Sequence, residues 1–421
     1  MYYSPKTSTD GLVFHYDTGN TVRSYLGEPT TNFVPGTYGY TTYAYVSGPV
    51  DTAVFNEKNQ LTTVKRYTIT EAINTARARI LPSGLTTGVA YTFSFKWKYN
   101  GTTTASPSVG IDASKGNPEG GANNNSFTSA TTNTVSIGNG WYLSTYTFVF
   151  SSVPTGQCML TFGIVTGSTA GFVGETFDIY EAQFEIKNHR TQYSNGTRSA
   201  TQGLKDLTAK NTINISTVSF DSNAQITFDG TDDTLDTGIP LTSFPALSNF
   251  SIECMAKINS YPTAAPPNGY GSITKAGVLL GAAYYSGTAL YWYGNSSGSA
   301  CTVYAYIRGA DAYRTAGGFD LTPGRHHHLV LVNDYTGGTL KLYANGTLNG
   351  SATTATQEYN PGLTPSAGNI GISKAQVDGG GELVYSYLPC EVPSVKLYNR
   401  VLTASDVQRN FNAVKSRFNI A

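Results

Sequence analysis

The sequence has few charged residues and no net charge. Asp, Glu, Lys and Arg make up 13% of the 421 residues, whereas roughly 25% is usual for a globular protein. Lys plus Arg and Asp plus Glu both number 27, so the formal charge is zero. Without a basic surface there is no field to hold a nucleic acid backbone or an anionic lipid surface. We therefore expect neither nucleic acid nor a membrane among the partners.

A secretion signal and paired cysteines are also missing. The first six residues, MYYSPK, contain neither the basic nor the apolar region of a signal peptide, which predicts synthesis in a cytoplasm. Cys158, Cys254, Cys301 and Cys390 lie far apart and form no CxxC pair. This spacing favours free, mostly buried thiols over disulfides.

The abundant residues are those of β-structure. The chain contains 45 Gly, 30 Tyr and 19 Phe, and aromatic and turn-forming residues favour strands joined by tight turns. In YTFSFKW at 91–97, aromatic residues alternate with Thr92, Ser94 and Lys96, which predicts one buried and one solvent-facing side. Trp97 and Trp141 are expected in the core. The dipeptide at 345–346, Asn-Gly, predicts a type I′ hairpin turn.

One segment has a convincing helical pattern. Thr403 and Asp406 have the spacing of a capping box. An apolar stripe at helical spacing follows, formed by Val407, Phe411, Val414 and Phe418. We expect a short C-terminal helix here. The segment 70–80 is a weaker candidate, for which a loop with one helical turn is an equal alternative.

Five motifs of the C-terminal half follow one another in an informative order. They are FDGTDD at 228–233, FSIECM at 250–255, GRHHHLV at 324–330, LYANG at 342–346 and LYNRVLTASD at 397–406. As a series they resemble the laminin G-like, concanavalin A-like domain family, in which similar strands, a hairpin and an exit to a short helix occur in this order. Met255 and Arg325 depart from the resemblance, because the family usually has an aromatic residue at the first position and Trp at the second.

The resemblance also implies how the domains are arranged. The family commonly opens with a strand similar to GLVFHYDTGN at 11–20 and continues into a loop similar to GLKDLTAKN at 203–211, but here a long segment separates the two. This implies a discontinuous sandwich of residues 1–30 and 196–421, with a second domain, 31–195, inserted into its first loop. The expected fold class is all-β: two antiparallel β-sandwich (jelly-roll) domains, one concanavalin A-like, and a short C-terminal helix.

The inserted segment has motifs of its own. GWYLS at 140–144 and IYEAQFE at 179–185 resemble strands of the jelly-roll carbohydrate-binding modules that many phage tail and head appendage proteins carry. Such a jelly roll beside a laminin G-like domain, without a signal peptide, implies a bacteriophage virion protein. A protein of this kind is made in the host cytoplasm and released by lysis.

Two patterns invite a catalytic interpretation, and the sequence favours a structural one for both. In the triple histidine at 326–328, at most the first and third residues share a strand face, and no Cys or carboxylate at metal-ligand spacing accompanies them. A retaining glycosidase needs two carboxyl groups about 5–5.5 Å apart. Glu175, Asp178 and Glu181 are spaced by three, which puts neighbours on opposite faces of a strand. We therefore expect no enzymatic activity.

An acidic turn is a candidate calcium site. Asp229, Asp232 and Asp233, with Asp236 nearby, offer the hard oxygen ligands that Ca²⁺ prefers. The alternative, which the sequence favours, is an Asp-Gly turn whose carboxylates cap their own backbone amides. In the inserted segment, Asp178 resembles a position at which related jelly rolls sometimes hold a structural calcium.

A tyrosine-rich stretch supplies candidate glycan-binding residues, namely Tyr291, Tyr293, Tyr304 and Tyr306. Exposed aromatic rings stack on the CH groups of sugars. On a strand Tyr291 and Tyr293 share one face, so both face outward if Trp292 faces the core. The alternative is a role in packing or in subunit contacts, since Tyr is enriched at protein interfaces.

Together these observations predict a non-enzymatic structural protein of a phage virion, displayed as a fibre, whisker or decoration. Weak attachment to cell-surface or environmental glycans would gain strength from many copies. Other virion proteins and further copies of the chain are expected partners. Two alternatives stay open: a carbohydrate-binding module of a secreted or surface carbohydrate-active protein, and a purely architectural spacer.

Overall fold

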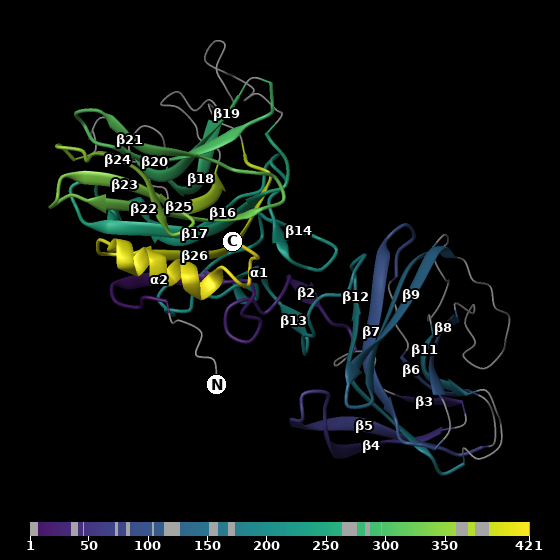
Figure 1. Ribbon diagram of the computed structural model, residues 1–421. Coiled ribbons are helices and arrows are strands. Elements are labelled where there is room, and N and C mark those ends of the chain that lie inside the picture. The colour runs from purple at the N-terminus through teal and green to yellow at the C-terminus, as the bar shows by residue number, and fades with distance from the viewer. Residues whose placement is uncertain are drawn as a thin grey trace. The chain divides into compact units, whose positions relative to one another are not determined.

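The computed structural model divides the chain into two compact units. The described residues are 7–34, 41–44, 46–71, 75–80, 85–102, 105–112, 127–150, 159–166, 173–262, 276–282, 287–295, 297–358, 369–374 and 387–420. The larger unit comprises Met1–Pro29, Ser199–Asp221 and Gln225–Ala421, and the smaller unit comprises Thr30–Arg198 and Ser222–Ala224. Both are built from antiparallel sheets, which confirms the all-β class (Figure 1).

The larger unit is a sandwich of two six-stranded sheets. The first contains β1 (Leu12–Asp17), β17 (Phe250–Ile258), β22 (His326–Asp334), β23 (Thr339–Ala344), β24 (Thr347–Thr353) and β26 (Cys390–Tyr398), in the order β1-β26-β17-β22-β23-β24. The second contains β16 (Leu235–Pro240), β18 (Ala276–Ala282), β19 (Thr288–Gly294), β20 (Cys301–Arg308), β21 (Tyr313–Asp320) and β25 (Asn369–Lys374), in the order β16-β25-β18-β19-β20-β21. Short elements complete it: α1 (Ala200–Gly203), β14 (Ser219–Phe220), β15 (Ile226–Thr227) and the 3₁₀ helix η1 (Leu241–Ser243).

Side chains from both sheets meet in one hydrophobic core. Ile252 and Cys254 of β17 belong to it, as do Leu290 and Trp292 of β19. In each pair the two residues are separated by one position, because successive side chains of a strand lie on opposite faces. The alternating patterns of the sequence therefore specify which face of each sheet is buried.

The cysteines of the larger unit are buried and free, as predicted. Cys254, Cys301 and Cys390 form no disulfide, and burial, with Asp320 nearby, raises the pKa of the Cys301 thiol to about 12. Cys158 lies outside the described residues.

The two ends of the chain meet in the first sheet. β1 pairs with β26, and His15 lies opposite Lys396. Beyond β26, the Thr403 hydroxyl accepts a hydrogen bond from the N–H of Asp406, whose carboxylate accepts one from the N–H of Thr403. This capping box starts α2 (Ala404–Val414), which lies along the outer face of the first sheet (Figure 1). The predicted helix is confirmed, but Phe418 follows it instead of extending its stripe.

The smaller unit contains a six-stranded and a four-stranded sheet. The first comprises β4 (Val46–Phe55), β5 (Leu61–Ile69), β7 (Ala90–Tyr99), β9 (Phe127–Gly138), β10 (Trp141–Phe150) and β12 (Thr176–Glu185), in the order β4-β5-β12-β7-β10-β9. The second comprises β3 (Thr41–Ala44), β6 (Thr75–Ile80), β8 (Ala105–Asp112) and β11 (Met159–Thr166), in the order β3-β6-β11-β8. A two-stranded ribbon joins β2 (Thr30–Thr31) and β13 (Thr197–Arg198).

The two faces of β7 differ from the prediction in one respect. Its aromatic residues lie in the hydrophobic core, as expected. The other face is not solvent-facing along its length, because Thr92 and Ser94 are buried and Lys96 is half-buried. The Thr92 hydroxyl donates to the carbonyl of Lys187, and Lys96 pairs with Glu57. These polar groups are satisfied by protein partners in place of water.

The helical alternative for 70–80 is wrong. TARARI at 75–80 forms β6, which pairs with β11 and β3. Ala and Arg alternate there with the period of a strand, and sheet pairing on both edges overrides their helix propensity. No helix among the described residues has the length and apolar character needed to cross a membrane.

Candidate functional site

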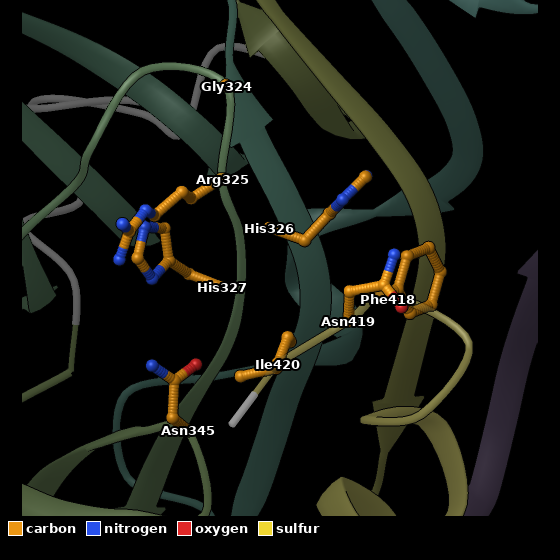
Figure 2. A pocket seen from close by; sticks show the side chains of 8 residues that line it. All are labelled: Gly324, Arg325, His326, His327, Asn345, Phe418, Asn419 and Ile420. Atoms are coloured by element: carbon orange, nitrogen blue, oxygen red, sulfur yellow. The ribbon is translucent and has the colours of Figure 1, made fainter.

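A pocket opens on the larger unit where the C-terminal tail passes the start of β22. Its volume is about 610 Å³, and residues 324–327, Asn345 and 418–420 line it (Figure 2). Three segments supply these residues: the turn into β22, the hairpin turn between β23 and β24, and the tail that follows α2. The fold therefore gathers the pocket from parts of the sequence that lie far apart.

His327 at the pocket wall has one unsatisfied ring nitrogen. The residue is 7% exposed, and its ring meets the edge of Phe319 with 5.1 Å between centroids. Its Nε2 accepts a hydrogen bond from the N–H of Thr322 (3.3 Å), which places the proton of the neutral ring on Nδ1. Among the described residues this Nδ1 has no hydrogen-bond partner. Burial, followed by the charges of His326 and Arg325, lowers the pKa of His327, so the ring is neutral at pH 7.

The remaining walls combine a cation, an aromatic ring and amides. Arg325 is exposed, and in Figure 2 its guanidinium lies beside the His327 ring. The rings of His326 and Phe418 pack with 4.8 Å between centroids. The Asn345 side chain uses its oxygen to accept a hydrogen bond from the N–H of the residue after His327 (3.0 Å). Its amide nitrogen is left to donate elsewhere.

This arrangement suits binding better than hydrolysis. None of the eight lining residues carries a carboxylate, whereas glycoside hydrolysis commonly depends on a pair of Asp or Glu side chains. Ligand sites typically combine an apolar or aromatic wall with a few hydrogen-bonding groups that fix orientation. Phe418 supplies the first, and Arg325 and Asn345 supply the second.

The three histidines at 326–328 have separate surroundings, so they form no common metal site. His328 is buried between the first sheet and α2, and its Nε2 lies 3.2 Å from the carboxylate of Glu253. Glu253 also accepts hydrogen bonds from Lys396 (2.6 Å) and from Asn410 of α2 (2.6 Å). Burial opposes ionisation of Glu253, but Lys396 and His328 outweigh it and hold the pKa well below its usual range.

The four tyrosines proposed from the sequence come together on the second sheet. The rings follow one another from Tyr304 to Tyr293, Tyr291 and Tyr306, with centroids 5.7, 4.8 and 5.5 Å apart. Trp292 faces the core, which meets the condition for Tyr291 and Tyr293 to point away from it. The expected exposure is wrong for Tyr291 and Tyr306, which are 1% and 2% exposed because they pack in a second apolar cluster. Tyr293 and Tyr304 are partly exposed.

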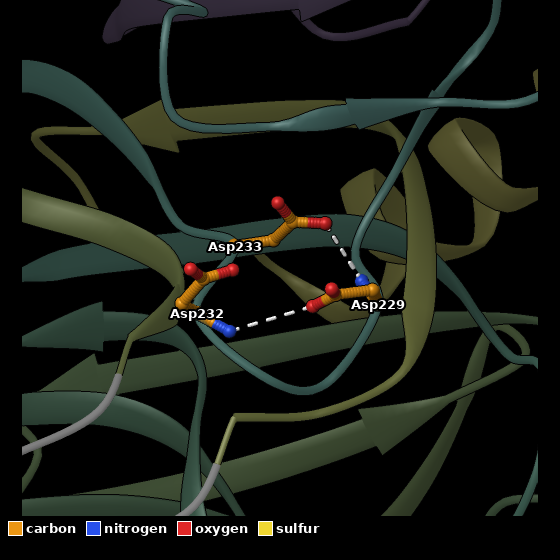
Figure 3. A group of neighbouring side chains, drawn as sticks. All are labelled: Asp229, Asp232 and Asp233. Atoms are coloured by element: carbon orange, nitrogen blue, oxygen red, sulfur yellow. Dashed lines mark hydrogen bonds between the residues drawn. The ribbon is translucent and has the colours of Figure 1, made fainter.

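The acidic turn uses two of its three carboxylates internally (Figure 3). Carboxylate oxygens of Asp229, Asp232 and Asp233 lie within 4.8 Å of one another. Asp229 accepts hydrogen bonds from the N–H groups of Thr231 (2.7 Å) and Asp232 (3.4 Å). Asp233 accepts from the N–H of Asp229 (2.8 Å) and from the Ser219 hydroxyl (3.2 Å), and burial raises its pKa. These bonds are those of the self-capping turn that the sequence favours over a calcium site.

Glu175, Asp178 and Glu181 of the smaller unit are each bound to a different partner. Both oxygens of Asp178 accept hydrogen bonds from Arg66, at 2.6 and 2.7 Å. Glu181 pairs with Lys96 at 2.7 Å, and Glu175 accepts hydrogen bonds from neighbouring tyrosine and threonine hydroxyls. Asp178 therefore has an arginine where the resemblance suggests a calcium ion.

Sequence reasoning missed the pocket. The sequence marks Arg325 only as a departure from the family pattern and places Phe418 on the helical stripe. The tail turns back after α2, where Asn419 has a φ of 52°, a left-handed conformation that Asn adopts more readily than most residues. An Asn soon after the last helical turn is the signal that predicts such a turn.

Residues 228–408 match the family model described as the concanavalin A-like lectin/glucanases superfamily. This part of the larger unit is therefore concanavalin A-like in fold, in agreement with the fold class predicted from the sequence. No curated protein matches the chain.

Solved structures show partial likeness at low identity. A Trypanosoma rangeli sialidase in complex with 2,3-difluorosialic acid is 15% identical, with 51% of this chain and 31% of that chain covered and a TM-score of 0.33. The sialidase CBM40 of Ruminococcus gnavus bound to α2,3-sialyllactose is 16% identical, with 38% and 80% covered and a TM-score of 0.28. A mutant of HCR/D is 12% identical, with 51% and 50% covered and a TM-score of 0.34. The chain spans less than a third of the length of the trypanosomal sialidase.

Proposed function

We propose that the protein binds glycans without cleaving them, through the pocket at the start of β22, as a displayed component of a bacteriophage particle. The observation that carries the binding is a pocket of about 610 Å³ in a concanavalin A-like domain, lined by a phenyl ring, a guanidinium and amides and by no carboxylate. The ring of Phe418 would cover the CH face of a sugar, and the polar groups would bind its hydroxyls.

A matched pair of variants tests the binding. We expect Phe418→Ala to reduce retention of the full-length chain on a glycan array at least about fivefold, because the aromatic wall is lost. Phe55→Ala removes an exposed ring from the smaller unit and should leave retention unchanged. Thermal unfolding of both variants checks that the fold is intact. Full retention by the Phe418 variant would exclude the pocket, and loss on Tyr293→Ala instead would place the site on the tyrosines.

The particle location rests on the sequence, in which a jelly roll that resembles phage appendage modules accompanies the lectin-like domain. Many displayed copies would compensate for weak single sites, and other virion proteins and further copies of the chain would be its partners. Gold-labelled antibody on particles from lysates of the source culture tests this by electron microscopy. Label at a repeated position supports a virion component, whereas label on cells or soluble debris favours the carbohydrate-binding module. Repeated label without glycan binding favours the architectural spacer.

A further inference from the structure

Two hydrogen-bond donors lie at one wall of the pocket, and among the described residues no acceptor bonds to both of them. His327 presents a protonated Nδ1 that has no partner among the described residues. The Arg325 guanidinium is close enough for its charge to act on the pKa of His327, and Figure 2 shows it beside that ring. A buried donor left unsatisfied lowers the stability of the fold. Both donors would be satisfied by one acceptor placed between them.

The charges around the pocket favour a negative acceptor. Glu391 is paired with Lys257 (2.6 Å), and Asp17 is paired with Arg417 (2.7 Å). Among the described residues Arg325 makes no such pair, so its positive charge is not offset locally. Burial, followed by nearby charges, lowers the pKa of both His326 and His327, which keeps the two rings neutral at pH 7. Among the described residues that line the pocket, Arg325 therefore supplies the one positive charge that no carboxylate offsets.

We propose that the ligand is an acidic sugar whose carboxylate is bound between the Arg325 guanidinium and the His327 Nδ1–H. This rests on the glycan binding proposed above and names its substrate class. Arginine binds a carboxylate in a planar, two-pronged geometry, and one carboxylate balances the single positive charge. A phosphate monoester carries about −1.5 to −2 at pH 7 and would leave excess negative charge. Phe418 and Asn345 would then contact the sugar ring and its hydroxyls.

The site needs little rearrangement to accept this group. Arg325 is exposed, so its side chain is free to move and open the Nδ1 of His327 to the ligand without disturbing the core. The pocket is open to solvent, so the rest of an oligosaccharide chain has room to extend. Because a neutral sugar offers no charged acceptor, it would leave the donor pair without its strongest partner.

A glycan array with matched pairs tests the proposal. Each acidic glycan, containing a uronic or nonulosonic acid, is placed beside its carboxyl-reduced neutral form and beside a sulfated form. We expect the full-length chain to bind acidic members at least about tenfold more tightly than their reduced partners. Arg325→Gln should abolish this preference while neutral sugars are still retained. Arg23→Gln, which removes an exposed arginine outside the pocket, should preserve it.

A second variant tests whether acidic glycans bind through a direct hydrogen bond to His327 or only through the long-range charge of Arg325. His327→Phe keeps a ring against Phe319 but removes the Nδ1 donor and the acceptor of the Thr322 N–H. We expect it to reduce binding of acidic glycans about two- to tenfold, with no more than a small fall in the melting temperature. Equal binding of acidic and reduced glycans, or a preference that survives Arg325→Gln, overturns the acidic-sugar proposal and leaves the general one standing. The carboxylated sugar is overturned as the ligand if the sulfated forms bind more tightly than the carboxylated ones. It is also overturned if free acetate binds more tightly than the acidic glycan with which it competes. Retention of no glycan overturns both proposals.

Discussion

Replacing Lys396 with methionine removes the positive charge from the buried cluster under α2. Lys396 lies 2.6 Å from the carboxylate of Glu253, and both residues are almost completely buried. Methionine has a similar length, so the substitution leaves Glu253 with Asn410 and His328 but without its counter-charge. The cluster connects α2 to the first sheet, and α2 leads into the tail that carries Phe418.

Leaving one member of a buried ion pair without its partner costs about 3–5 kcal/mol. Because Glu253 keeps a hydrogen bond from Asn410 at 2.6 Å, we expect the lower end, about 3 kcal/mol at pH 7. The loss should shrink as the pH falls. Without Lys396, burial raises the pKa of Glu253 above its unfolded value, so the folded variant takes up a proton and is relieved of the charge.

Differential scanning calorimetry measures this on the transition of the larger unit at pH 7 and pH 5. The double variant Glu253→Gln with Lys396→Met replaces two charges by two neutral side chains and should recover at least half of the loss. A loss below about 1 kcal/mol for Lys396→Met would refute the reasoning. A double variant whose loss equals the sum of the two single losses would refute it as well, since the charges would then be uncoupled.

Three further predictions concern single positions. Burial, followed by Lys396, lowers the pKa of His15 to about 4 from 6.5. Between these pH values the unfolded chain binds more protons, so the free energy of unfolding falls as the pH drops, by at most about 3 kcal/mol. His15→Gln should reduce this pH dependence of the free energy of unfolding, measured with urea. Millimolar calcium should shift the melting temperature by less than about 1 °C, because the acidic turn is self-capped, and a larger shift would identify a cation site. Asp229→Ala should lower the free energy of unfolding by about 1 kcal/mol, because the capping hydrogen bonds are lost. Tyr291→Ala should cost about 3–5 kcal/mol in the same unfolding assay, since the ring is buried, and a neutral effect would contradict its role in packing.

Local sequence patterns predicted the elements that one strand or one turn determines. Asn345 and Gly346 have the positive φ values, 49° and 81°, that the predicted hairpin turn requires. Thr403 caps α2 as its spacing indicates. The motif series identified the sandwich, because four of the motifs each overlap one of its strands and FDGTDD forms the turn before β16. These features depend on neighbouring residues, whose pattern is visible in the sequence.

The exposure of the tyrosines and the position of the pocket depend on contacts between distant segments, which no local sequence pattern contains. Strand alternation placed Tyr291 opposite Trp292 correctly, but alternation does not reveal whether the second face is covered, and Tyr291 is buried there. The pocket needs Arg325, Asn345 and Phe418 to converge from three segments. Their convergence follows from the pairing of β22 with β23 and from the turn of the tail after α2. Neither is encoded within a single window of the sequence.

Saturation-transfer difference NMR tests the central claim most directly, because one sample reports both binding and cleavage. The full-length chain is mixed with the acidic glycan best retained on the array, and spectra are recorded over several hours. We predict saturation transfer to the protons of the sugar that contacts Phe418, weaker transfer in Arg325→Gln, and no new anomeric signals. Absence of transfer from wild-type protein would contradict glycan binding, and the appearance of reducing-end products would contradict a non-catalytic role.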